Sequence, residues 1–219
     1  MKNYLFYSLV SILLVSVLFV SSCSSEEALD PYMNPNQSDT SGNNIRIDLF
    51  MKANINNTTL NYMNGIGGYS NSVKSNKDGL CGADPNIFIQ SHQTVFSNSN
   101  SLESITIDIK GCVVDDALVD INKIDSVLIV GRYEFFPNRK NNRSVIVTYT
   151  DVDGVLWSSD LGGNKTTFSK FELSAVISND SDPYSEKIAY GVFDSYLYNA
   201  TGDVIEVRDG QFKCRIGQH

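Results

Sequence analysis

Residues 191–216 read GVFDSYLYNATGDVIEVRDGQFKCRI, and this stretch decides the fold. Successive side chains of an extended chain point to opposite faces, so Phe193 and Leu197 share one face and Tyr196 and Tyr198 share the other. The Asn-Ala-Thr-Gly-Asp segment that follows is typical of a turn between two strands. The stretch therefore predicts adjacent antiparallel strands with one buried face.

The same period of two continues along most of the chain after residue 45. These runs are rich in Val, Ile, Tyr, Phe and Thr, and clusters of Asn, Asp, Gly and Ser separate them, as in short strands joined by turns. Asp209-Gly210 predicts a two-residue hairpin between the last two strands, because glycine adopts a positive φ without steric penalty. The predicted strands are residues 45–50, 52–56, 86–90, 104–110, 126–135, 144–150, 154–159, 167–177, 187–199, 203–210 and 211–216.

One segment departs from this pattern. In residues 114–125, the apolar residues Ala117, Leu118, Ile121 and Ile124 recur at the spacing of one helix face. The sequence has no repeat of fixed period, which argues against a propeller or a solenoid. It therefore predicts an all-β fold, an antiparallel β-sandwich of roughly 9–11 strands with one short helix. A β-barrel is the alternative.

The N-terminal segment predicts export and a lipid anchor. Lys2 precedes an apolar run at residues 5–20, and Cys23 follows the small residues Ser21 and Ser22. The run is shorter than the roughly 20 residues of a membrane-spanning helix, and no basic flank follows it. The motif resembles the lipobox of bacterial lipoproteins, in which the cysteine sulfur carries a diacylglycerol. An ordinary signal peptide that leaves Cys23 as a free thiol is the alternative.

The lipobox resemblance divides the chain into three parts. Residues 1–22 are then a signal peptide, and residues 23–44 are the lipidated cysteine with a tether rich in Asn, Ser and Pro. Such a tether buries too little apolar surface to fold. Residues 45–219 form a single β-sandwich domain. The partner of Cys23 is then the lipid bilayer, and we expect an outer-membrane anchor facing the periplasm or the cell surface.

The charge of the chain limits its partners. Without residues 1–22, it has 16 basic and 25 acidic side chains, a formal charge of −9. Phosphate groups repel such a surface, so we do not expect nucleic acid as a partner.

Three further cysteines predict one disulfide in an oxidising compartment. Cys81 lies in a Gly- and Asp-rich segment and Cys112 ends an alternating run, so both lie at strand ends and form the favoured pair. Cys214 alternates with Phe212 and Ile216 and is expected to be buried. A Cys112–Cys214 bridge is the competing pairing. Three scattered cysteines are a poor metal site.

The sequence contains no pattern that predicts a catalytic residue, a metal site or a cofactor. A Ser-His or Cys-His nucleophile needs a histidine, and His92 lies in a polar segment that predicts a solvent-exposed loop. His219 is the last residue. The acidic residues cluster at turns such as Asp151-Val152-Asp153, where an aspartate bonds to nearby backbone amides. These turns lack the ligand spacing of a recognised calcium loop.

Aromatic residues offer the remaining binding candidates. Tyr196 and Tyr198 share the face opposite Phe193, where they can stack against sugar rings or a protein partner. Coverage of both strand faces, as at the centre of a sandwich, is the alternative. Tyr133 and Phe136 lie at the end of another predicted strand.

The last 30 residues carry a family resemblance. They resemble small Bacteroidota lipoproteins of uncharacterised function, in which Gly-x-Phe, a strand, a Gly-Asp turn and a closing Asp-Gly-x-Phe strand follow one another. The resemblance implies a β-sandwich in a surface or periplasmic lipoprotein and transfers no catalytic residue. The matching positions are Gly191, Phe193, Gly202, Asp209, Gly210 and Phe212.

Together these features predict a membrane-anchored, non-enzymatic envelope or surface lipoprotein. Its domain is expected to bind or scaffold a glycan or an envelope protein. Two alternatives remain at this point. One is a polysaccharide- or peptidoglycan-acting hydrolase with two loop carboxylates. The other is a structural subunit of a surface assembly that pairs with a neighbour's strand.

Overall fold

The computed structural model describes residues 49–114, 121–137, 142–162, 168–178 and 187–217, so the predicted signal peptide, Cys23 and the tether lie outside the described residues. The described chain is almost entirely β, with eleven strands and one short helix, α2 (Ile121–Val127). The strands are β1 (Phe50–Ile55), β2 (Thr58–Met63), β3 (Tyr69–Leu80), β4 (Ile87–Asn98), β5 (Ser104–Val114), β6 (Gly131–Phe135), β7 (Arg143–Thr150), β8 (Leu156–Ser158), β9 (Lys170–Ser178), β10 (Lys187–Tyr198) and β11 (Val204–Ile216).

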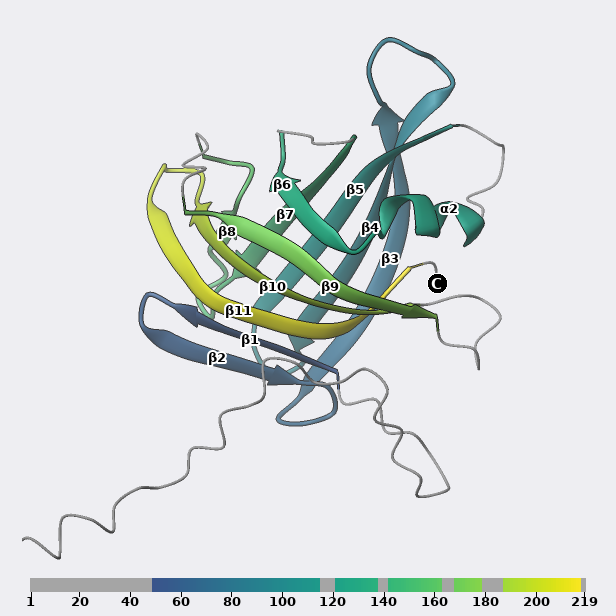
Figure 1. The fold of residues 1–219 in the computed structure, drawn as a ribbon. Helices are drawn as coiled ribbons and strands as arrows, with labels where there is room; N and C mark the ends of the chain where they lie inside the picture. The colour runs from purple at the N-terminus through teal and green to yellow at the C-terminus, as the bar shows by residue number, and fades with distance from the viewer. Residues whose placement is uncertain (1–48, 115–120, 138–141, 163–167, 179–186, 218–219) are drawn as a thin grey trace, which may run out of the picture. The chain divides into compact units, whose positions relative to one another are not determined.

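The eleven strands form one sheet in the order β2-β1-β11-β10-β9-β6-β7-β5-β4-β3. The short strand β8 pairs with both β7 and β10 and thereby closes a ring of β10, β9, β6, β7 and β8. All pairs are antiparallel except β6 with β7. The other six strands pack outside this five-stranded closed barrel (Figure 1). The predicted all-β class is confirmed, and both the sandwich and the barrel are compatible with it.

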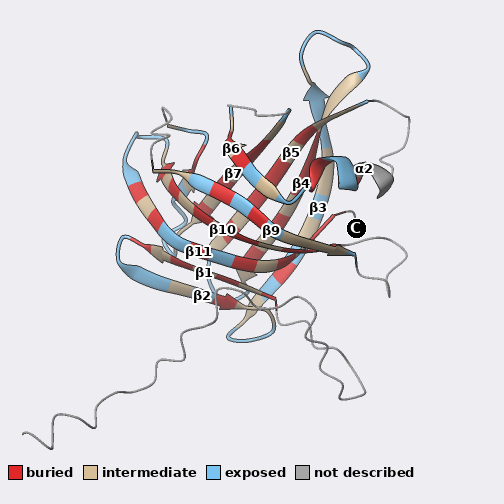
Figure 2. Cartoon of the chain, in the orientation of Figure 1, coloured by how far each residue is buried: buried red, intermediate tan, exposed pale blue. Residues whose placement is uncertain are grey.

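Alternate residues of the strands are buried, and together they form one hydrophobic core (Figure 2). Along β10 the odd-numbered residues from Lys187 to Leu197 are buried, and Tyr196 and Tyr198 on the opposite face are half-buried. The predicted alternation of residues 193–198 is therefore confirmed. Phe171, Phe193 and Phe212 meet at the centre of the core, with ring centroids 5.6–6.3 Å apart.

The predicted hairpin at Asp209-Gly210 is wrong, because β11 continues through it. Asp209 has a φ of +54°, and the register of β11 shifts there against both β1 and β10. The two residues thus form a β-bulge, which absorbs one extra residue without reversing the chain. Glycine is required at 210, since a Cβ atom would lie 2.6 Å from the ring of Phe193.

Two other predictions change at their boundaries. Of the helix predicted at residues 114–125, residues 115–120 lie outside the described residues. The described part is α2, which ends at Val127, and Val114 belongs to β5. The strand predicted at 126–135 accordingly starts only at Gly131. Strands β2 and β3 have no counterpart among the predicted strands. In β3 the Ser, Asn and Lys residues show no apolar alternation.

Candidate functional site

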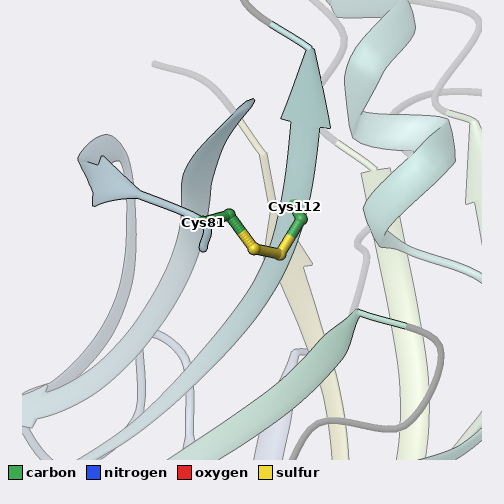
Figure 3. The surroundings of a disulfide bond; sticks show 2 residues. All are labelled: Cys81 and Cys112. Carbon is green, nitrogen blue, oxygen red and sulfur yellow. A yellow bond between two sulfur atoms is a disulfide. The ribbon is translucent and has the colours of Figure 1, made fainter. Parts of the chain in front are cut away.

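The disulfide between Cys81 and Cys112 confirms the favoured pairing (Figure 3). Cys81 follows β3 and Cys112 lies near the end of β5, with their Cα atoms 5.7 Å apart. The Cys81 amide donates to the carbonyl of Ile87, which closes the β3–β4 hairpin beside the bridge. Cys214 is a buried free thiol, as its alternation predicted, so the competing Cys112–Cys214 bridge is wrong.

Turn chemistry accounts for two of the acidic clusters. The Asp151 carboxylate accepts hydrogen bonds from the amides of Asp153 and Val155 and from the Trp157 indole nitrogen. The Asp203 carboxylate accepts from the side chains of Asn199 and Thr201 in the turn between β10 and β11. Both aspartates therefore hold the loops that contain them.

A cluster of aromatic and charged groups lies on the outer face of β9, β10 and β11. We call Phe168, Lys170, Asp194, Tyr196 and Arg208 the outer strip. The rings of Phe168 and Tyr196 lie 5.1 Å apart, and the Arg208 guanidinium lies 3.6 Å from the centre of the Phe168 ring. Lys170 Nζ lies 3.2 Å from an Asp194 carboxylate oxygen.

The bulge of β11 fixes one side of the outer strip. The Asp209 amide donates to the Asp194 carboxylate at 2.8 Å, and the Asp209 carboxylate accepts from the Asn54 side chain of β1 at 3.1 Å. Arg208 also pairs with Glu206 on its own strand, at 2.5 Å. The strip thus combines two aromatic rings with both hydrogen-bond donors and acceptors, on neighbouring strands of one sheet.

The other predicted aromatic residues lie elsewhere. Tyr133 is buried and faces no solvent, because its hydroxyl bonds with backbone groups of Val127 and Ile129 at the end of α2. Phe136 directly follows β6. The Tyr198 ring covers Gly162, where a Cβ atom would lie 2.0 Å from it. Of the four predicted aromatics, Tyr196 therefore belongs to the outer strip.

The inner face holds a buried carboxylate at one end, which we call the tyrosine end. Glu103 precedes β5 and is 8% exposed. The hydroxyls of Tyr69 and Tyr149 donate to its two carboxylate oxygens, each at 3.1 Å. The Tyr62 hydroxyl is buried without a hydrogen-bond partner, and its ring lies 4.5 Å from that of Tyr69. Burial and the nearby Glu103 charge raise the pKa of Tyr62 and of Tyr149.

The opposite end of the inner face, the histidine end, contains Gln90 and His92 of β4. The prediction of a solvent-exposed loop at His92 is wrong, since this side chain is fully buried and burial lowers its pKa to about 4. Its Nε2 atom and both polar atoms of the Gln90 side chain are buried without a hydrogen-bond partner. Helix α2 packs nearby on β5, where Val127 covers Gly111, the residue opposite Gln90.

Within the described ranges, no group of three or more His, Cys, Asp and Glu side chains is arranged to hold a metal ion. No helix in that part of the chain has the length and hydropathy needed to cross a membrane. Comparison with known proteins gave no matching family model, no matching curated protein and no matching solved structure.

Proposed function

We propose that this chain is a lipid-anchored protein of the outer membrane whose β domain binds an envelope glycan through the outer strip, without catalysing a reaction. The N-terminal lipobox supports the anchor, and the Cys81–Cys112 disulfide supports an oxidising compartment. The last 30 residues resemble small Bacteroidota lipoproteins, and this resemblance also supports a lipid anchor.

The outer strip is the observation that carries the binding proposal. A sugar ring presents apolar C–H groups on its face and hydroxyls around its rim. The rings of Phe168 and Tyr196 can stack on the apolar face of a sugar ring. The sugar hydroxyls can bond with the donors and acceptors of Lys170, Asp194 and Arg208. Because these groups lie on or beside paired strands, little conformational freedom is lost when a ligand binds.

Binding of the mature protein to capsular polysaccharide, lipopolysaccharide and peptidoglycan fragments tests this proposal. Tyr196→Ala is expected to weaken binding about 10-fold or more, since aromatic anchors dominate such contacts. The matched control is Tyr190→Ala, on the same strand and also beside a cation, with Lys213 Nζ 5.4 Å from its ring centre. Equal losses in the two variants, or no binding to any of these glycans, would contradict the proposal.

The anchor is tested separately. Cys23→Ala is expected to abolish incorporation of radiolabelled palmitate and to release the protein from sedimented membranes. Cys214→Ser, which changes a buried thiol of the folded domain, is the control and should retain the label. Label that persists in Cys23→Ala would show that Cys23 does not carry the lipid.

A further inference from the structure

Two hydrogen bonds join strands that are not neighbours in the sheet. Strand β3 ends the strand order, whereas β11 lies between β1 and β10. The Asn71 side-chain oxygen of β3 accepts from the Arg215 amide at 3.0 Å, and the Ser75 hydroxyl donates to the Gly217 carbonyl at 2.6 Å. We call these two bonds the β3–β11 seam. The seam closes the histidine end of the inner face.

The seam determines which nitrogen of His92 carries the proton. The single hydroxyl hydrogen of Ser75 is used by the Gly217 carbonyl, because a carbonyl only accepts. The His92 Nδ1 atom lies 2.8 Å from the same hydroxyl oxygen and must therefore donate to it. His92 is thus a neutral imidazole with hydrogen on Nδ1. Its buried Nε2 is an unpaired acceptor.

A second proton on His92 would be buried, and burial is what lowers the pKa of this side chain. Two lysines and one aspartate lie on the neighbouring elements. Lys187 is 8% exposed at the start of β10, pairs with Ile216 in the strand register, and forms an ion pair with Asp125 of α2. On β3, Lys77 lies two residues beyond Ser75 on the same face. On α2 the Asp125 carboxylate is exposed and pairs with Lys187.

The remaining strands offer the imidazole no charge. On β5, Ile109 lies directly opposite His92, and the next residue on that face is Gly111. On β4 itself the neighbour is the neutral Gln90. On the buried face of β11 the titratable side chain is Cys214, whose pKa burial raises to about 12. A buried imidazolium would therefore lack a carboxylate partner among the described residues, which favours exposure of the charge to water.

We propose that the β3–β11 seam is an acid-sensitive latch: protonation of His92 opens the seam and exposes the histidine end, while the rest of the domain stays folded. The opened form binds the proton more tightly than the closed form, so the balance shifts toward opening as the pH falls. This latch is independent of glycan binding at the outer strip, which lies on the other face of the sheet.

Cys214 is a built-in reporter of the opening. It is a fully buried free thiol two residues before Ile216, and its neighbour Thr94 accepts a hydrogen bond from Asn71 of the seam at 2.8 Å. Dithiodipyridine reacts with thiols in acid as well as at neutral pH. We divide the reaction rate of Cys214 in the mature protein by the rate of a free cysteine peptide at the same pH. This relative rate is proportional to the fraction of molecules in which the seam is open.

Between pH 7 and about pH 4, where half of the His92 side chains of the closed form are protonated, the relative rate is expected to rise about 100-fold. In His92→Gln the rate should stay flat, because the amide keeps a donor for Ser75 and takes no proton. Ser75→Ala should raise the rate already at pH 7, since it removes one of the two seam bonds.

The fluorescence of Trp157, on β8 and hydrogen-bonded to Asp151, should be unchanged over the same pH range and separates local opening from global unfolding. A relative rate that does not rise in acid overturns the proposal. So does a rise of equal size in His92→Gln, because carboxylates elsewhere would then cause the opening. A rise that coincides with loss of the native Trp157 signal also overturns it.

Discussion

The two ends of the inner face are stabilised differently. At the tyrosine end, two tyrosine hydroxyls donate to the Glu103 carboxylate, and one buried hydroxyl lacks a partner. At the histidine end, three polar atoms of Gln90 and His92 lack partners, and the disulfide lies close by, because Cys112 directly follows the Gly111 that faces Gln90. Hydrogen bonds to a buried carboxylate hold the tyrosine end, whereas the two seam bonds and a nearby disulfide hold the histidine end.

This difference predicts opposite pH sensitivities. A buried neutral imidazole loses stability as protons are added, whereas buried tyrosines next to a carboxylate lose stability as protons are removed. We therefore expect acid to act first at the histidine end and alkali first at the tyrosine end. The four predictions below test the comparison in order of decreasing effect.

Removal of the disulfide should have the largest effect. Cys81→Ser combined with Cys112→Ser is expected to lower the free energy of unfolding by about 3–4 kcal/mol, because the unfolded chain regains the freedom of a loop that spans 31 residues. Urea unfolding measures the loss. Reductant should reproduce it in the wild-type protein and have no effect in the double variant. Exchange of amides that open locally should quicken at the histidine end and stay unchanged around Glu103, whereas amides that exchange through global unfolding should quicken throughout.

Glu103→Leu should destabilise the protein by about 2–3 kcal/mol, because the buried Tyr149 hydroxyl and the partly buried Tyr69 hydroxyl lose their acceptor. Glu172→Gln, an exposed change on β9, is the control and should stay within about 0.5 kcal/mol of the wild type. Adding Tyr149→Phe should recover part of the loss, because it removes one unpaired hydroxyl. Thermal and urea unfolding of these variants give the values. No recovery would mean that Glu103 acts through packing alone.

Alkaline titration should weaken the protein through the tyrosine end. The pKa values of Tyr62 and Tyr149 are raised in the folded state, so this state keeps protons that the unfolded chain loses above pH ~10. Their stabilising contribution is present below that pH and falls as the pH rises, by about 1 kcal/mol per tyrosine at pH ~11. Ultraviolet absorbance of tyrosinate measures the ionisation of the tyrosines, and urea unfolding at the same pH values measures the stability. Ionisation of these two tyrosines at the pH of exposed tyrosines, with no loss of stability, would contradict the raised pKa values.

Residues close in the sequence could be predicted better than contacts between distant strands. The alternation of residues 193–198 and the burial of Cys214 are local patterns, and both are confirmed. The disulfide could be predicted because both cysteines lie at strand ends. The Asp-Gly dipeptide at 209–210 suits a hairpin and a bulge equally, and pairing with β1 and β10 selects the bulge.

The polar interior was not predictable by the same rules. His92 lies among Gln, Ser and Thr residues, which look solvent-exposed until β3 and β11 cover them. Glu103 meets tyrosines from positions 62, 69 and 149, and no local spacing brings these four residues together. The outer strip likewise needed the register that places Arg208 beside Phe168.

Gln90→Leu should have the smallest effect and the opposite sign to Glu103→Leu. The wild-type amide is 3% exposed and makes none of its hydrogen bonds, so the folded state already carries the penalty of its burial. Leucine has a similar volume and removes that penalty, and we expect a gain of about 1 kcal/mol in the free energy of unfolding. Gln93→Leu, on the other face of β4 where the amide donates to Asp108 at 3.3 Å, is the matched control and should show no gain. Urea unfolding of both variants decides the question. A loss of more than about 1 kcal/mol in Gln90→Leu would show that this amide has a hydrogen-bond partner in solution and would contradict the difference between the two ends.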